Sequence, residues 1–480
     1  MTERLRGLDH IFLHVDSPNR PMNICNVFLY DEPIDKTKML EEIHRHVETF
    51  PRVKQRPVEG GLFSTAKWAD CPDFKLEDQC TEHTLKEGTE AELQNFTAEF
   101  YAKPWDRNKP LWRVAFVNGL KSGGAMVLVG HHCYADGQGF VRAFFYHTDA
   151  RKLLEEKWEE HKKSMRLKKQ KPLQAKDLPL LRNPALLPYT EQLPKPALSA
   201  WASLVGLLQL VATFVVGFLL MFKLWVEGMV FTRKSLNYKG EQTTEKLMSW
   251  TAPMSMEDIK TVRKAYDLTL NDVMCTVVTR AVKTYLEDIK GRHDDYVSMM
   301  IPFSLRYPDD YRVYNVSTGS VGYFPLYDMP TESLAKAVHQ EMMNYKRGFV
   351  PQFFYFYMTY AGLIPLFLPL WFINWILGKI HCVLTNVPGP HQEIEYGGQR
   401  VRGLRPFPPQ NSKGSLGLAI FSYAGNITVQ CITDKTEAYP DQAHRVCEII
   451  NQEFDRVVLD AKAKLKERAI EEYMPEKKQN

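Results

Sequence analysis

The stretch from residue 125 to residue 140 reads AMVLVGHHCYADGQGF. An unbroken apolar run ends in Gly130 and two adjacent histidines, and an acid and two glycines precede a second apolar segment, Phe140 to Phe145. This pattern predicts a buried strand, a tight turn and a helix. A histidine at the end of a buried strand sits on a rigid element that can aim a base into a cleft. Because there are two histidines, one can act while the other supports it.

The composition around this stretch is that of an ordinary globular protein. The chain has 480 residues, which is too long for a single core and predicts two or three domains. Its net charge of +4 is too balanced to favour nucleic acid as a partner. The eight cysteines are scattered without a CxxC pair, which predicts neither a disulfide scaffold nor a zinc site. This cysteine usage favours a reducing, cytosol-facing location. The N-terminus lacks the apolar core of a signal peptide, so we expect no cleaved secretion signal.

Residues 1–150 are expected to form a compact α/β unit around the histidine strand. The segment GLKSGG at 119–124 predicts a hairpin turn, so the histidine strand is its second arm. Apolar residues at helical and strand spacing predict the remaining elements. The expected elements are a strand at 26–30, helices at 36–50 and 85–101, and hairpin strands at 113–118 and 125–130.

A basic and proline-rich linker is expected at 151–195, followed by a membrane-associated segment at 196–235. Six basic residues between 162 and 171 fit either a solvated helix end or contact with a membrane surface. Residues 196–222 carry no charge and are long enough to cross a bilayer of ~30 Å, so we expect one transmembrane or deeply embedded helix. A buried pair of core helices and a reentrant hairpin are the alternatives. The flanking charges do not fix an orientation.

The C-terminal part, residues 236–470, is expected to form a second α/β domain. It contains a second apolar region at 350–378, in which Pro365 and Pro369 argue against a straight spanning helix. Its aromatic residues suit an interfacial element or the wall of an acyl-chain tunnel, although a pair of core helices is equally compatible. The other expected elements are helices after Ser255, at 272–286 and at 443–466, and strands at 296–302, 381–386, 416–423 and 426–432.

The chemistry is expected at the HxxxD pair formed by His132 and Asp136. A neutral imidazole with a pKa of ~6.5 can take the proton of an attacking alcohol and return it to a leaving thiolate, without a metal ion. The short spacing suggests that Asp136 folds back across the turn and holds the imidazole or an arginine such as Arg306. Asp136 can also cap the following helix, and the two roles are compatible.

Six short motifs occur in an order typical of one family. They are PWDRNKPLW at 104–112, HHxxxDG at 131–137, LNDV at 270–273, IPFSLR at 301–306, TNVPGP at 385–390 and SYAG at 422–425. Together with Leu8-Asp9, Phe12 and Pro21-Met22 near the N-terminus, the chain resembles the bifunctional wax ester synthase/diacylglycerol acyltransferase family over nearly its whole length.

This resemblance implies a fold and a reaction. The implied fold class is α/β, with two chloramphenicol-acetyltransferase-like domains and an active-site tunnel between them, to which this chain adds the membrane-associated segment. The implied activity is an O-acyltransferase that moves a long-chain acyl group from acyl-CoA, a substrate rather than a cofactor, to a fatty alcohol or diacylglycerol. The alternatives are transfer to another alcohol or amine, and a non-catalytic membrane lipid-binding protein of the same fold.

The resemblance also assigns the site residues. It makes His132 the general base, while His131, Asp136 and Gly137 shape the turn. Asn271 and Asp272 match an Asn-Asp motif that either helps to bind the reacting carbonyl or starts a helix with Asn271 as its cap. We therefore expect His132, His131, Asp136 and Asn271 as catalytic residues, no metal ligands, and Gly137, Asp272, Thr385 and Asn386 as substrate-binding residues.

Three positions depart from the family pattern. Trp105 stands where leucine is common, Asn23 where histidine is common, and Thr385 where serine is common. The apolar insert resembles that of membrane-anchored members, which implies a location at the endoplasmic reticulum or lipid droplets with the catalytic domains facing the cytosol. The oligomeric state is left open.

Overall fold

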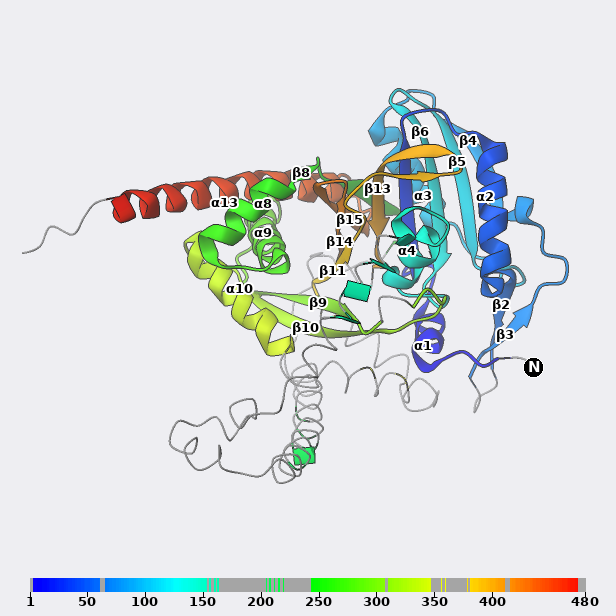
Figure 1. Cartoon of the computed structure of the whole chain (residues 1–480), viewed down its shortest axis with the longest axis horizontal. Coiled ribbons are helices and arrows are strands. Elements are labelled where there is room, and N and C mark those ends of the chain that lie inside the picture. Colours follow the sequence, from blue (N-terminus) through cyan, green and yellow to red (C-terminus); the bar gives the residue numbers. More distant parts are fainter. Residues whose placement is uncertain are drawn as a thin grey trace, which may run out of the picture.

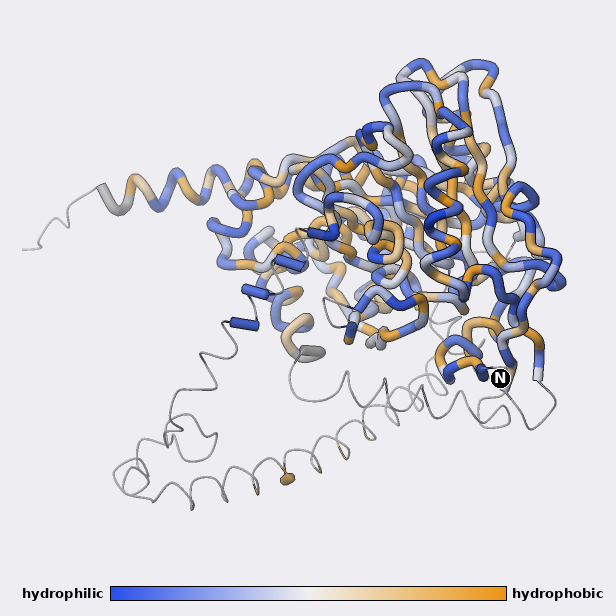
Figure 2. Tube along the Cα trace, turned by 45° about the vertical axis from the view of Figure 1, so that its right-hand side comes forward, coloured by the Kyte–Doolittle hydropathy of each residue, from blue (hydrophilic) through white to orange (hydrophobic). Residues whose placement is uncertain are grey.

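Two β-sheets, each covered by helices, form the body of the molecule (Figure 1). The computed structural model describes residues 3–60, 65–152, 243–306, 310–346, 380–410 and 415–473, with isolated positions between 155 and 219 and at 355, 359 and 378. Apolar residues gather where the elements pack, and polar residues line outward-facing turns such as those of the long C-terminal helix (Figure 2). The prediction of an α/β fold is confirmed.

The histidine strand lies inside the first sheet. This strand, β6, pairs antiparallel with β1 on one side and with β5 on the other, so both of its edges are hydrogen-bonded. Its residues are apolar because they are buried between neighbouring strands and covering helices. The strand order is β12-β13-β1-β6-β5-β4, with bounds Ile394–Tyr396, Gln399–Phe407, Asn23–Tyr30, Gly123–His131, Trp112–Leu120 and Cys80–Thr84.

Among the described residues of the N-terminal half, four helices accompany this sheet, and one of them begins later than predicted. The expected helix at 85–101 starts at Glu90, because the Thr89 side chain accepts a hydrogen bond from the Glu92 amide and caps it. The Glu92 carboxylate in turn accepts from the three amides at 86–88 and holds them in a loop. The helices are α1 (Gly7–Val15), α2 (Lys36–Thr49), α3 (Glu90–Ala102) and α4 (Gly137–Phe145).

Short elements connect these strands and helices. A small antiparallel pair, β2 and β3, lies outside the main sheet, and two 3₁₀ turns, η1 and η2, flank it in the chain. Their bounds are Pro51–Lys54 (η1), Gln55–Val58 (β2), Lys67–Asp70 (β3) and Leu76–Gln79 (η2).

The second sheet is mixed and carries its helices on one face. β11 runs parallel to both β9 and β14, whereas the other pairs are antiparallel. The order is β10-β9-β11-β14-β15-β7, with bounds Ser317–Pro325, Tyr296–Ser304, Cys382–Pro388, Leu416–Tyr423, Asn426–Asp434 and Lys246–Trp250, and β8 (Met254–Ser255) pairs with β15.

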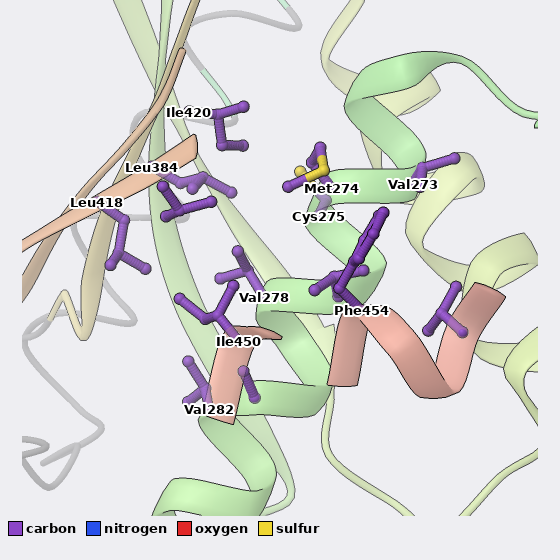
Figure 3. Packing of buried hydrophobic residues seen from close by; sticks show 14 of the residues in the cluster. Val273, Met274, Cys275, Val278, Val282, Leu384, Leu418, Ile420, Ile450 and Phe454 are labelled. Atoms are coloured by element: carbon purple, nitrogen blue, oxygen red, sulfur yellow. The ribbon is translucent and has the colours of Figure 1, made fainter. Parts of the chain in front are cut away.

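The helices of the second half pack on this sheet through one hydrophobic core. Side chains of the central helix α9 meet those of α13, β11 and β14 (Figure 3). Val278, Leu384, Leu418 and Ile450 are each at most 2% exposed, which makes this the rigid support of β11. The helices are α8 (Met256–Tyr266), α9 (Leu270–Thr284) with the π-helical turn η5 (Tyr285–Ile289), α10 (Thr331–Lys346) and α13 (Gln442–Tyr473).

The sheet topology corrects the predicted domain boundary. Residues 236–470 were assigned to a second domain, but β12 and β13 lie in the first sheet, where β13 pairs with β1. The first sheet is therefore completed by strands from the C-terminal part of the chain. A sequence pattern marks a strand, but it does not indicate which of two sheets that strand joins.

The two long apolar regions lie almost entirely outside the described residues, so the predictions for 196–222 and 350–378 are not tested here. The same is true of most of the linker at 151–195. Within the described part of the chain, no helix combines the length and the apolar character needed to cross a bilayer.

Candidate active site

The turn after β6 fixes the two histidines by main-chain contacts. His131 is the last residue of β6 and faces Asn23 of β1 in register. The His132 amide donates to the Met22 carbonyl at 2.7 Å, so the chain stays attached to the β1 side as the strand ends. The predicted strand, turn and helix are confirmed, and α4 begins at Gly137.

The His131 imidazole is buried and both of its nitrogens face protein groups. Its side chain is 0% exposed, and its Nδ1 accepts a hydrogen bond from the Cys133 amide at 3.1 Å. Because Nδ1 accepts, the proton of the neutral ring belongs on Nε2, which lies 3.5 Å from Asp16 Oδ1. Burial alone would raise the pKa of Asp16, but contacts with His131, the Met22 amide and Arg107 outweigh it and lower that pKa.

The His132 imidazole is only partly buried and has a different environment. Its Nδ1 lies 3.1 Å from Asn315 Oδ1, and the Phe12 ring of α1 packs against it with 4.0 Å between centroids. Burial lowers the pKa of His132 to about 4, since its loss of hydration outweighs the opposing effect of Asp136. His132 is therefore a neutral imidazole at physiological pH, which is the form a general base requires.

Asp136 combines the two roles expected of it. Its Oδ1 accepts from the Gly139 amide at 2.7 Å and caps α4, and its Oδ2 accepts from the Val316 amide at 2.7 Å. Arg306 Nη2 lies 3.5 Å from Oδ2. The contact with Arg306 and the cap are both confirmed, and together with the Val316 amide they occupy both carboxylate oxygens.

Arg306 connects this turn to the loop that follows β9. Its guanidinium is buried between Asp136 and Asp310, and it donates to the main-chain carbonyls of Arg312 and Tyr314. These contacts fold residues 310–316 against the HHxxxDG turn. Two distant segments of the chain thus form a single rigid wall of the site.

Gly137 lies close to β11, which carries two of the predicted binding residues. A Cβ atom at Gly137 would stand 3.7 Å from Val387 Cγ2. Side chains alternate along a strand, so Thr385 shares the face of Val387, toward the turn. Asn386 points to the other face, where its Nδ2 donates to Asn271 Oδ1. The structure therefore brings Thr385 to the histidine side and pairs Asn386 with Asn271.

The Asn-Asp motif starts α9, with a different cap from the one predicted. Thr269, rather than Asn271, is the N-cap, and it forms a capping box with Asp272. The Asp272 carboxylate, 1% exposed, also lies 2.8 Å from His339 Nδ1. Protein groups therefore already occupy Asp272 Oδ2. This indicates that Asp272 stabilises the start of α9 and does not bind substrate through that oxygen.

Trp105 and Asn23, two of the three residues that depart from the family pattern, are hydrogen-bonded to each other. Trp105 Nε1 donates to Asn23 Oδ1 at 2.8 Å, and Asn23 Nδ2 donates to the Tyr101 carbonyl. Asn23 is the residue opposite His131 in the sheet. The two substitutions thus satisfy each other on the His131 side of the turn.

Two cavities border Asp9 and Asp16, the carboxylates behind the two histidines, although neither is lined by His131 or His132 themselves. One, of about 900 Å³, extends to Asp9 and is lined by Arg6, Arg52 and Arg312. The other, of about 1070 Å³, extends to Asp16, the partner of His131. Both are lined by residues from the two halves of the chain. Within the described residues, no group of histidine, cysteine and carboxylate side chains is arranged to hold a metal ion.

Asn315 was missed by the sequence analysis, and so was the role of Asp16. Asn315 belongs to none of the six motifs. Asp9 and Phe12 were noted only as part of the N-terminal resemblance. No signal in a single sequence links position 315 to position 132, because the link is made by the fold.

The two-sheet fold and the strand–turn–helix that presents one neutral imidazole define an acyltransferase of the HHxxxDG kind. Comparison with known proteins agrees: residues 5–274, more than half of the chain, match the wax ester synthase/diacylglycerol acyltransferase catalytic domain, and residues 324–457 match the C-terminal domain of the same proteins. The chain belongs to the wax ester synthase/diacylglycerol acyltransferase family and is an O-acyltransferase.

Relatives resemble the chain over most of its length, and solved structures share its fold. Two Mycobacterium tuberculosis proteins named as probable diacylglycerol O-acyltransferases are 23% identical over 80% of this chain and 79% of tgs1, and 24% identical over 87% of this chain and 91% of tgs2. The wax ester synthase/diacylglycerol acyltransferase of Marinobacter aquaeolei VT8 has a TM-score of 0.62 at 17% identity, covering 95% of this chain and 99% of that one. A condensation domain of the calcium-dependent antibiotic synthetase shares the fold, with a TM-score of 0.61 at 12% identity over 96% of this chain and 98% of that one.

Proposed function

We propose that this enzyme transfers a long-chain acyl group directly from acyl-CoA to a fatty alcohol or diacylglycerol, with His132 as the general base. The observation that carries the proposal is the environment of His132. Its imidazole is held at Nδ1, is neutral at physiological pH, and stands at the end of a strand whose neighbours keep it rigid. The names of the family and of its relatives supply the substrate classes.

In the proposed reaction, His132 Nε2 removes the proton of the acceptor hydroxyl as its oxygen attacks the thioester carbonyl. The carbonyl carbon becomes tetrahedral, and the C–S bond then breaks. The imidazolium returns the proton to the CoA thiolate, so the products are an ester and free CoA. The acyl group passes to the acceptor in one attack, without a covalent acyl-enzyme.

The tetrahedral oxyanion needs a hydrogen-bond donor. We assign this role first to the Thr385 hydroxyl, because Thr385 shares the strand face of Val387, which approaches Gly137. Asn271 is the second candidate: its Oδ1 is engaged by Asn386, which leaves its Nδ2 to donate. A Thr385→Val variant is expected to lower kcat about tenfold or more, and Thr385→Ser, which keeps the hydroxyl, is the matched control.

The decisive test is ester formation by a His132→Ala variant. Loss of a general base is expected to lower kcat about 10²-fold or more. His444→Ala removes an exposed histidine on α13 and serves as the control. Activity of His132→Ala within tenfold of the wild type would overturn the proposal. Mass spectrometry of neutral lipids from a host that lacks them, with fatty alcohol supplied or withheld, distinguishes wax ester from triacylglycerol.

We further propose that apolar acceptors reach the enzyme at a lipid surface. Six described residues between 204 and 219 are helical, apolar and about half exposed: Leu204, Leu207, Leu208, Val211, Val215 and Leu219. Such a stripe gains free energy by contact with acyl chains. Replacing Leu207, Val211 and Val215 by serine is expected to reduce flotation with phospholipid vesicles, and unchanged flotation would contradict the idea. A location at the endoplasmic reticulum or lipid droplets stays a prediction.

A further inference from the structure

Asn315 occupies a buried position between α1 and the HHxxxDG turn. It stands just before β10 and is 2% exposed. Its side-chain Nδ2 donates to Asp9 Oδ1 at 2.7 Å and to the main-chain carbonyl of His132 at 2.8 Å. Its Oδ1 lies 3.1 Å from His132 Nδ1. All the polar atoms of this amide therefore contact the base or the residue that anchors it.

These contacts determine the orientation of the amide. The main-chain carbonyl of His132 can only accept, so the NH₂ group must face it and the carbonyl oxygen must face the imidazole. Since Asn315 Oδ1 cannot donate, the hydrogen bond to the ring requires a proton on His132 Nδ1. The second ring nitrogen, Nε2, then carries the lone pair.

Asp9 holds Asn315 from the other side. Besides the contact with Nδ2, Asp9 Oδ1 accepts from the Asn315 main-chain amide at 3.2 Å. Phe12, one turn later on α1, packs on the His132 ring. One helix thus supplies both the anchor of the amide and the surface that keeps the imidazole in place.

We propose that Asn315, anchored by Asp9, is a positioning residue for the transfer reaction, because it keeps the proton of neutral His132 on Nδ1 and leaves Nε2 as the base. The tautomer assignment rests on contacts alone, whereas its effect on rate rests on the proposed function. Asn315 is not expected to touch substrate.

The kinetic test uses variants of similar volume. Asn315→Leu removes the acceptor and is expected to lower kcat about 10²-fold while KM changes less than about threefold, since a base with the wrong tautomer binds substrate but cannot take its proton. Asp9→Asn keeps an acceptor for Asn315 and is expected to retain kcat within about tenfold. An Asn315→Leu variant with kcat within threefold of the wild type would overturn the proposal.

An exchanged double variant, Asp9→Asn with Asn315→Asp, provides the rescue. It keeps an acid–amide pair but places the carboxylate against the imidazole, where its charge favours imidazolium. We expect more activity than in Asn315→Leu, and an acid limb of the kcat/KM profile that lies at higher pH than in the wild type. An exchanged variant that is no more active than Asn315→Leu would overturn the proposal.

The tautomer is read directly by NMR of protein labelled with ¹⁵N-histidine, with His132→Gln assigning the signal. The wild type is expected to show a protonated Nδ1 and an unprotonated Nε2 near pH 7, and Asn315→Leu is expected to lose this pattern. This measurement needs no substrate. If the tautomer behaves as proposed but no ester forms with any acceptor, the proposed function fails and the positioning role stands; a His132 signal with Nε2 protonated in the wild type refutes the positioning role itself.

Discussion

His131 and His132 are neighbours in the chain, yet their imidazoles stand in opposite tautomers. His131 accepts at Nδ1 from the Cys133 amide and directs Nε2 toward Asp16, whereas His132 directs Nδ1 toward Asn315. His131 ends β6 and His132 begins the turn, so the chain changes direction between them: the His131 ring is fully buried beside Asp16, and the His132 ring contacts Asn315. The difference teaches that the role of each histidine is set by which nitrogen its surroundings occupy.

The largest expected effect is a loss of stability when Arg306, which holds residues 310–316 against the HHxxxDG turn on the His132 side, is replaced. An Arg306→Met substitution would leave Asp136 and Asp310 without their buried cation. Removing one partner of a buried ion pair costs about 3–5 kcal/mol, so a large fall in thermal stability is expected. Lys260→Met is the control, since its pair with Glu257 is 59% and 79% exposed and such a surface pair contributes under about 1 kcal/mol. Equal melting temperatures for the two variants would contradict this account.

The next effect separates the two histidines. His131→Ala leaves a small cavity and strands the Cys133 amide, with an expected loss of about 2–4 kcal/mol in the free energy of unfolding. The fraction that remains folded is expected to keep a substantial kcat. Denaturant unfolding and active-site titration together measure the two quantities. If His131→Ala kept full stability but lost its turnover, the roles of the two residues would have to be exchanged.

A smaller effect is expected at the Trp105–Asn23 pair on the His131 side. Trp105→Phe removes the indole N–H and leaves Asn23 Oδ1, on a residue that is 0% exposed, without its donor. A double-mutant cycle with Asn23→Leu is expected to give a coupling of about 0.5–1.5 kcal/mol in stability, with kcat nearly unchanged. A coupling near zero would show that the two departures from the family pattern are independent.

The smallest expected effect is a near absence of pH dependence. An unperturbed histidine with a pKa of ~6.5 would lose about tenfold in basic form between pH 7.5 and pH 5.5. Since burial lowers the pKa of His132 to about 4, the base stays neutral over this range and is lost only as pH falls through about 4. The kcat/KM of an Asp9→Asn variant is therefore expected to change less than about twofold between these pH values, whereas the wild type also contains Asp9, whose pKa is raised to about 7 by burial and which titrates within this range. An acid limb near pH 6.5 would place the working imidazole in a more hydrated setting.

Much of the framework was predictable from local pattern. The hairpin of β5 and β6, the strand β14 and the helix start at Ser255 follow from alternation, turn residues and caps, all of which act over a few residues. Asp136 was also predictable as cap and brace, because its spacing from His132 leaves few other geometries.

The remainder depends on contacts between distant positions. Asn315 is 183 residues from His132, and Asp9 is 306 residues from Asn315. A hydrophobic pattern within a single segment therefore cannot predict that these residues contact one another. The cap of α9 was misplaced by two residues, because Thr269 and Asn271 are both good caps and only the capping box with Asp272 decides between them. The separation of Thr385 from Asn386 onto opposite faces likewise required the register of β11.

The position of β13 late in the sequence affects how the first sheet can form during synthesis. β1 is complete when residue 30 leaves the ribosome, but its partner on one side, Gln399–Phe407, is synthesised near the end of the chain. Until then β1 presents an apolar strand with an unpaired edge, which invites pairing with other nascent chains. Translation of most of the chain must therefore precede closure of the first sheet, and chaperone binding during this interval is the expected safeguard against aggregation.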